Sequence, residues 1–172
     1  NPEEGADAIA AAAQIVTAVQ SIVSRNIAAT DPCVITIGKF HAGTAGNIIA
    51  DRAELTGTIR TTSSETRYRA MQRLKETAEG VAKAMGAQAS VQFRPGYIAQ
   101  KNDDRVMDLL METAAECVGK EMIFQKPYPS MGVEDFAFYS AQRPSVFFFA
   151  GTGYPDRKNY GIHHGRFEAD ER

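Results

Sequence analysis

The segment CVITIGKFHAGTAGNIIADRAELTGTIRT, residues 33–61, decides the fold that the sequence predicts. Its beginning, Cys33 to Phe40, is mainly apolar and β-branched, which is typical of a strand. In its last part, Ala53 to Thr61, apolar positions such as Leu55 and Ile59 alternate with polar ones, as in a half-buried strand. The segment therefore predicts two antiparallel strands with a loop between them.

The loop itself, His41 to Asn47, is a run of small residues. It is too rich in glycine for a strand interior and too long for a two-residue turn. Small residues let a backbone come close to another group. Two interpretations are open: a flexible hairpin connection, which the composition slightly favours, or a backbone surface that contacts a ligand or a partner chain.

Helical patterns flank the two strands. Residues 7–25 carry apolar side chains at helical spacing, and residues 62–85 do the same after Thr62 and Glu65, which have the spacing of a capping box. A further strand is predicted over residues 89–93. This order suits two helices on one face of an antiparallel sheet. A ferredoxin-like unit needs one more strand before the first helix, so we expect the sequence to begin inside a domain.

A second unit begins near residue 98 and has the order helix, strand, helix, strand. Asn102 is expected to cap its first helix, with Leu109 and Cys117 facing inward. The last strand is predicted to be buried on both faces. Such a run is half of an α/β domain, so we expect the other half to lie elsewhere. The predicted elements are a helix over 102–118, a strand over 121–124, a short helix that ends near 141 and a strand over 145–150.

The composition excludes several classes of protein. The 172 residues suffice for one domain or two small ones, and 44% of them are apolar. A net charge of −2 without a long run of one sign argues against a nucleic-acid or anionic-membrane surface. The apolar run Val146–Ala150 is too short to span a bilayer. Cys33 and Cys117 lie in apolar patterns, which predicts reduced core thiols and a cytoplasmic location.

Two of the three histidines stand together in GIHHGRFE, residues 161–168. Imidazole is the commonest metal ligand in proteins and titrates near neutral pH. Adjacent histidines on a loop are more often solvated than coordinating. This motif therefore supports a metal site only together with other parts of the chain.

Three stretches, residues 41–51, 130–136 and 162–167, together resemble a known family. They are similar to the metal-dependent amidohydrolases of the aminoacylase and carboxypeptidase G superfamily, and most to the branch of hippurate hydrolases and indoleacetyl-amino-acid hydrolases. The resemblance runs along essentially the whole chain. The order and spacing of the three motifs are more specific than any one of them.

The resemblance implies an α/β protein of two domains. Residues 1–97 would be a ferredoxin-like lid without its first strand, which commonly forms a homodimer. Residues 98–172 would be the C-terminal part of a zinc-peptidase-like catalytic domain that holds two divalent metal ions, such as zinc or manganese. Most metal ligands and the general-base glutamate would lie outside this sequence. No catalytic residue is therefore assigned within it, and we expect the chain alone to be inactive.

The resemblance also assigns a metal ligand. His163 matches the family's last ligand. His164 is the less favoured alternative, because moving the register by one residue would misplace Arg166. The second nitrogen of a ligating imidazole usually donates to a carboxylate or carbonyl, and Glu168 and Asp135 are the candidates.

Six further residues are expected to contact the substrate. Asn47 matches a lid asparagine that reaches the substrate, in several relatives across a dimer interface. Arg60 matches a lid arginine that grips the substrate carboxylate, for which a guanidinium fork is suited. The alternative for Arg60 is an exposed surface ion pair of little energetic value. The other expected substrate-binding residues are His41, Ser130, Met131 and Glu134.

These assignments predict that the full-length protein hydrolyses the amide bond of N-acyl amino acids or related small amides. Two metal ions would activate a water molecule and stabilise the oxyanion. The alternative is a non-catalytic dimerisation or binding module that kept the fold without a complete metal site. An RNA-binding ferredoxin-like domain is disfavoured, because the chain lacks a basic face and paired strand aromatics.

Overall fold

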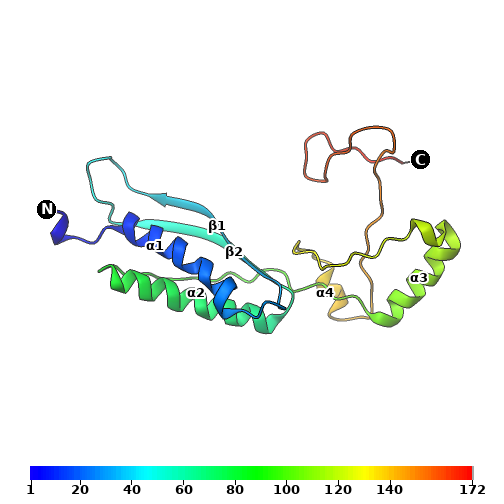
Figure 1. The fold of residues 1–172 in the computed structure, drawn as a ribbon, viewed down its shortest axis with the longest axis horizontal. Coiled ribbons are helices and arrows are strands. Elements are labelled where there is room, and N and C mark those ends of the chain that lie inside the picture. The colour runs from blue at the N-terminus through cyan, green and yellow to red at the C-terminus, as the bar shows by residue number, and fades with distance from the viewer. Residues whose placement is uncertain (172) are drawn as a thin grey trace.

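The computed structural model describes residues 1–171. The first half contains two paired strands and the helices α1 and α2, and in the second half the helices are joined by long irregular segments (Figure 1). The elements in chain order are η1 (Pro2–Glu4), α1 (Ala8–Ser21), the π-helical turn η2 (Ile22–Asn26), β1 (Cys33–Ala42), β2 (Ala53–Thr61), α2 (Ser64–Ala84), α3 (Asp104–Val118), η3 (Lys120–Met122) and α4 (Ala137–Ser140).

β1 and β2 form the antiparallel pair that the sequence predicts. Cys33 pairs with Thr61 at one end of the hairpin, and Ala42 pairs with Ala53 at the loop end. A bulge at Gly38 interrupts the register once. Because a bulge inserts one unpaired residue, it bends β1 and strengthens the local twist of the hairpin.

Gly57 is required for the two strands to approach each other near this bulge. A Cβ atom added at Gly57 would collide with the carbonyl oxygen of Thr36 on β1. Gly38, in the bulge itself, has no such neighbour within 4 Å. The close approach of the backbones therefore explains the glycine at position 57 and not the one at position 38.

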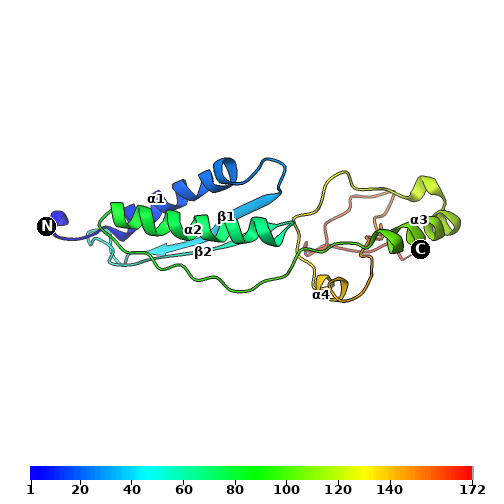
Figure 2. The same ribbon diagram turned by 90° about the horizontal axis from the view of Figure 1, so that it is seen from below.

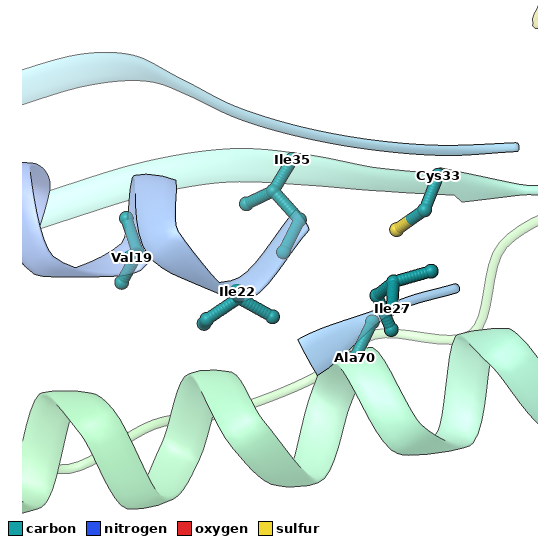
Figure 3. Close-up of a cluster of buried hydrophobic side chains, with 6 residues drawn as sticks. All are labelled: Val19, Ile22, Ile27, Cys33, Ile35 and Ala70. Atoms are coloured by element: carbon teal, nitrogen blue, oxygen red, sulfur yellow. The ribbon is translucent and has the colours of Figure 1, made fainter. Parts of the chain in front are cut away.

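α1 and α2 lie side by side on one face of the hairpin (Figures 1 and 2). Successive side chains of a strand point to opposite faces, so Cys33 and Ile35 are buried against the helices while Val34 between them is 40% exposed. A fully buried side chain such as Ile22 stabilises the fold by about 1.5–3 kcal/mol. The predicted layer of two helices on a sheet is confirmed here. The core cluster consists of Val19, Ile22, Ile27, Cys33, Ile35 and Ala70 (Figure 3).

α2 begins one residue later than the predicted capping box. Ser63, and not Thr62, is the N-cap, and its Oγ accepts a hydrogen bond from the backbone N–H of Thr66 at 3.1 Å. β2 continues through Thr61, so the chain needs one more extended residue before it turns into the helix. The prediction of a capping box between Thr62 and Glu65 is therefore wrong, although a serine cap performs the same function.

The helical stretch Ala8–Asn26 is long and apolar enough to cross a membrane by length and composition alone. Its exposed positions include Gln14, Thr17 and Gln20, whereas Ile22 on its other side is completely buried in the core. This division into a polar and an apolar face is that of a helix packed on a protein core. We therefore assign the stretch to the core, and a cytoplasmic location stays a prediction.

In the second half, Asp103 rather than the predicted Asn102 caps α3, and its carboxylate accepts a hydrogen bond from the first helical turn. The amide of Asn102 is engaged elsewhere. Its Nδ2 donates to the carbonyl oxygen of Phe147 at 3.0 Å, and its Oδ1 accepts the Phe147 backbone N–H at 2.9 Å. The neighbouring Gln100 hydrogen-bonds with Ser140 of α4. These bonds hold three segments of the second half together.

The strands predicted over residues 89–93, 121–124 and 145–150 are wrong for the part of the chain that the structure describes. No described segment pairs with them, and the 3-10 turn η3 replaces the start of the second one. A strand is stable only where a neighbour satisfies its backbone N–H and C=O groups. As a result Phe148 and Phe149, predicted to be buried, are 61% and 68% exposed.

α3 is likewise only partly covered by the described residues. None of its residues is buried, and Leu109, predicted to face inward, is 62% exposed. Cys117 is exposed, so the prediction that it is a core thiol is wrong, whereas Cys33 is buried as predicted. Among the described elements, α3 contacts only η3. The amphipathic pattern of α3 is real, and residues on its apolar side such as Val106 and Leu110 are half-buried, but the described residues bury none of them fully.

Candidate functional site

Arg60 connects two of the predicted substrate-binding segments. Its Nη1 donates a hydrogen bond to the carbonyl oxygen of Met131 at 2.9 Å, which joins the end of β2 to the segment before α4. In that segment the Ser130 Oγ accepts the backbone N–H of Gly132 at 3.3 Å and so fixes a tight turn. Glu134 follows in the same segment and is half-buried. Arg60, Ser130, Met131 and Glu134 therefore belong to one region.

The Arg60 guanidinium binds a carbonyl group in this arrangement. None of the ion pairs among residues 1–171 includes Arg60, so the surface ion pair that the sequence left open is not formed there. A guanidinium has five N–H donors, and the Met131 carbonyl occupies one. The remaining donors suffice for a bidentate contact with a carboxylate while the bond to Met131 stays in place.

His41 lies at the other end of the hairpin from Arg60. His41 pairs with Glu54 near the loop, whereas Arg60 pairs with Val34. Arg60 lies six positions after Glu54 in β2, which at about 3.3 Å per position is about 20 Å. Asn47 lies in the loop between β1 and β2, at the same end of the hairpin as His41. One copy of the chain therefore does not bring these residues and Arg60 to the same small ligand.

The loop between β1 and β2 is docked on the start of α1. The backbone N–H of Ala8 donates to the carbonyl oxygen of Ala50 at 3.0 Å. Gly43 has a φ of +76°, and a Cβ atom added there would lie 3.4 Å from a side chain of α1. The positive φ thus explains the glycine at position 43, whereas a Cβ atom added at Gly46 would meet nothing within 4 Å, so close backbone approach does not explain the small residues as a group. Asn47 in this loop and His41 near the end of β1 are both exposed.

Hydrogen bonds of Tyr154 to Asn159 and Ala169 hold together the two ends of the histidine loop, residues 161–168. Asn159 pairs with the backbone of Tyr154: its Oδ1 accepts the N–H and its Nδ2 donates to the carbonyl oxygen, both at 2.8 Å. The Tyr154 hydroxyl donates to the carbonyl oxygen of Ala169 at 3.0 Å. These bonds join the chain before the histidines to the chain after them.

Glu168, one candidate partner for a ligating imidazole, instead forms an ion pair with Arg157 beside Tyr154. Its carboxylate pairs with the Arg157 guanidinium at 2.5 Å, and that guanidinium lies 3.5 Å from the centre of the Tyr154 ring. Within residues 1–171 neither Glu168 nor the other candidate, Asp135, is hydrogen-bonded to His163. The predicted carboxylate partner of His163 is therefore not formed by the residues that the structure describes.

The two adjacent histidines have different surroundings. The His164 ring stacks on Tyr160 with 4.5 Å between ring centres, and its Nδ1 accepts the backbone N–H of Arg166 at 3.0 Å. The His163 imidazole is exposed and makes no hydrogen bond to any residue that the structure describes. The sequence does not indicate that Tyr160 stacks on His164, because a stacking partner on an irregular loop follows no periodic pattern.

No group of three His, Cys, Asp or Glu side chains in the described part of the chain could hold a metal ion. His163 has the chemistry of a single ligand, since it is an exposed imidazole with unengaged nitrogens. A catalytic zinc site takes about three protein ligands and keeps one position open. The described residues therefore supply one ligand, His163, to a metal site and not a complete set of ligands.

Residues 1–86, half of the chain, match the family model described as the peptidase dimerisation domain. The chain belongs to the M20 peptidase dimerisation-domain family. The hairpin, α1 and α2 lie within the matched residues and are thus the elements of this dimerisation domain. The prediction of a lid domain in the first half is consistent with this assignment.

Similarity to relatives of the M20 family continues beyond the dimerisation domain. The Synechocystis sp. protein named "Probable hydrolase sll0100" is 38% identical over 171 residues, which cover 99% of this chain and 44% of that protein. The N-acetyldiaminopimelate deacetylase of Streptococcus sanguinis is 36% identical over 171 residues, 99% of this chain and 44% of the deacetylase.

A solved structure agrees with these relatives. The Bacillus subtilis YXEP protein, a dinuclear metal-binding peptidase of the M20 family, superposes with a TM-score of 0.78 at 32% identity, over 98% of this chain and 42% of that one. The chain thus spans less than half the length of these relatives.

Proposed function

We propose that a full-length protein containing this chain is a metal-dependent hydrolase of the amide bond of N-acyl amino acids or related small amides. The observation that carries the proposal is the extent of the similarity. It covers 99% of the chain and includes the histidine loop, well beyond the dimerisation domain at residues 1–86. A dimerisation module without chemistry would need only the first part.

In this proposal His163 is one protein ligand of a site with two divalent metal ions, and the other ligands come from residues outside this chain. The YXEP peptidase, similar over 98% of the chain, is dinuclear. Bound metal ions would supply a water of lowered pKa and polarise the amide carbonyl. His163 fits this part because its imidazole has no other partner among the described residues.

Arg60 is proposed to hold the carboxylate of the amino-acid part of the substrate. Its Nη1 bond to Met131 fixes the guanidinium beside the turn at Ser130, and its other donors remain for two carboxylate oxygens. Holding the substrate at both its carboxylate and its amide places the scissile bond in one orientation, which lowers the entropic cost of reaction. Glu134 in the same segment is proposed to contact the substrate beside Arg60.

Asn47 and His41 are proposed to reach the substrate of the other subunit in a homodimer. His41 lies about 20 Å from Arg60 along the hairpin and Asn47 lies in the loop at the same end as His41, so a site that uses all three residues needs two copies of the chain. The dimerisation domain of the first half supports this arrangement. We also propose that the boundary between the two domains lies near residue 97 and that the native metal is zinc, manganese or a similar divalent ion. The full-length protein is further proposed to belong to the hippurate hydrolase branch and to be cytoplasmic.

The test is hydrolysis by the full-length protein with zinc or manganese added, using N-acetyl amino acids, hippurate and indoleacetyl amino acids as substrates. We expect release of the free amino acid from at least one class, loss of this activity with a chelator and its return with metal. The matched controls are the methyl esters of the same N-acyl amino acids, which keep the amide bond but lack the carboxylate that Arg60 would hold. No hydrolysis of any amide with either metal would favour the non-catalytic module.

A further inference from the structure

His164 is the most constrained residue of the histidine loop. Its ring stacks on Tyr160 with 21° between the ring planes, and its Nδ1 accepts the backbone N–H of Arg166 at 3.0 Å. Its backbone is engaged as well. The N–H donates to the carbonyl oxygen of Gly161, and the carbonyl oxygen accepts the N–H of Phe167, both at 2.9 Å.

The hydrogen bond at Nδ1 determines what the His164 imidazole can do. A neutral imidazole has one nitrogen with a lone pair and one nitrogen with a proton. Because the Nδ1 lone pair accepts the N–H of Arg166, the proton is on Nε2. Neither nitrogen then has a lone pair for a metal ion, so His164 is not a ligand in this arrangement.

His163 lies inside the turn that His164 closes. The bond from the His164 N–H to the Gly161 carbonyl makes residues 161–164 a four-residue turn, with Ile162 and His163 at its two central positions. The bond from Phe167 to His164 makes the next turn begin at His164. His164 is thus shared by two consecutive turns. Fixing its side chain therefore fixes the end of the turn that carries His163.

We propose that His164 is a positioning residue, which holds by its Nδ1 hydrogen bond the turn on which His163 meets a metal ion. This inference rests on the proposed function, because it takes His163 as a metal ligand. A turn that is already ordered loses less conformational freedom when the ion binds, so affinity rises. Loss of a group that orients a ligand typically lowers metal affinity by about 10–100-fold.

Three substitutions in the full-length protein separate the hydrogen bond from the ring. H164F keeps a ring but no acceptor, H164S keeps an oxygen that can accept the N–H two residues on but no ring, and H164A keeps neither. We expect H164A and H164F to raise the Kd for zinc by about 10-fold in competition with a chelating dye, and H164S to recover most of that loss. Wild-type affinity in both H164F and H164A would overturn the inference.

Nitrogen NMR of the 15N-histidine-labelled full-length protein tests the assignment without any activity measurement. We expect His164 to carry its proton on Nε2 in the metal-free protein, and 113Cd to couple to a nitrogen of His163 while His164 is unchanged. Coupling to His164 would overturn the inference and leave metal binding intact. A wild-type protein that binds neither zinc nor cadmium would overturn the proposed function, and this inference with it.

Discussion

The two halves of the chain have similar sequence patterns but bury them differently. Residues 1–86 pack two amphipathic helices on a hairpin, and Val19 and Ile22 are almost completely buried. Residues 98–171 include an amphipathic α3 and the aromatic stretch Phe147–Phe149, yet no residue of α3 is buried. An amphipathic pattern therefore predicts which side of an element will be covered. It does not predict whether the covering surface belongs to the same stretch of chain.

The largest expected difference between the halves is in independent folding. We expect residues 1–97, produced alone, to unfold in a single cooperative transition in urea, because they contain the core cluster. Residues 98–172 alone should show no such transition, because no residue of α3 is buried and Phe148 and Phe149 are largely exposed. Far-ultraviolet circular dichroism during urea titration measures both. A cooperative transition in the second piece would remove the contrast on which this account depends.

Within the 172-residue chain, a pair of substitutions compares the halves at single side chains. I22A empties a fully buried position and should lower the free energy of unfolding by about 2–5 kcal/mol. L109A, at a position 62% exposed, should change it by less than about 0.5 kcal/mol. Chemical denaturation of the two variants side by side is the measurement. Similar losses in both would show that α3 is covered after all.

A smaller effect is expected from two glycines within the hairpin. G57A places a Cβ atom against the Thr36 carbonyl oxygen and should cost about 1–3 kcal/mol of stability, because one strand has to move away. G38A is the control, since no atom outside the neighbouring residues lies within 4 Å of a Cβ there. Thermal unfolding of both variants measures the difference. Equal melting temperatures would mean that the strands at Gly57 are farther apart than described.

The two cysteines should differ strongly in the rate at which their thiols react, and only slightly in their effect on the stability of the protein. Cys117 is exposed and should react quickly with a thiol reagent, whereas Cys33 is buried and should react only when the first half unfolds. Burial also raises the pKa of the Cys33 thiol. The unfolded chain then loses this proton first as the pH rises, so stability should decrease slightly above a pH of about 8.5. The variant C33A should lack both the slow labelling phase and this decrease.

The hairpin could be predicted from sequence because its signal is local. Alternation in residues 53–61 and β-branched residues in residues 33–40 are properties of each strand alone, and the pairing confirms them. Each predicted N-cap was one position too early, because Ser63 and Asp103 are as able to cap a helix as their neighbours Thr62 and Asn102. Composition cannot decide between adjacent polar residues that are equally able to cap.

The candidate site could be predicted only in part, because its contacts are not local. The bond from Arg60 to Met131 joins residues 71 positions apart, and no pattern in the sequence signals it. The resemblance to a family selected His163 over His164 by register alone. The Nδ1 hydrogen bond of His164 is a separate reason for the same choice. The separation of His41 from Arg60 follows from the strand register, which the sequence does not fix.

The metal content of the full-length protein tests most directly whether the second half contributes one ligand to a site completed elsewhere. It would be measured by elemental analysis after dialysis, for the wild type, for H163A and for the 172-residue chain alone. We expect about two divalent ions per wild-type chain, fewer in H163A and no stoichiometric metal in the 172-residue chain. Equal metal content in the wild type and H163A, or stoichiometric metal held by the 172-residue chain, would contradict this account.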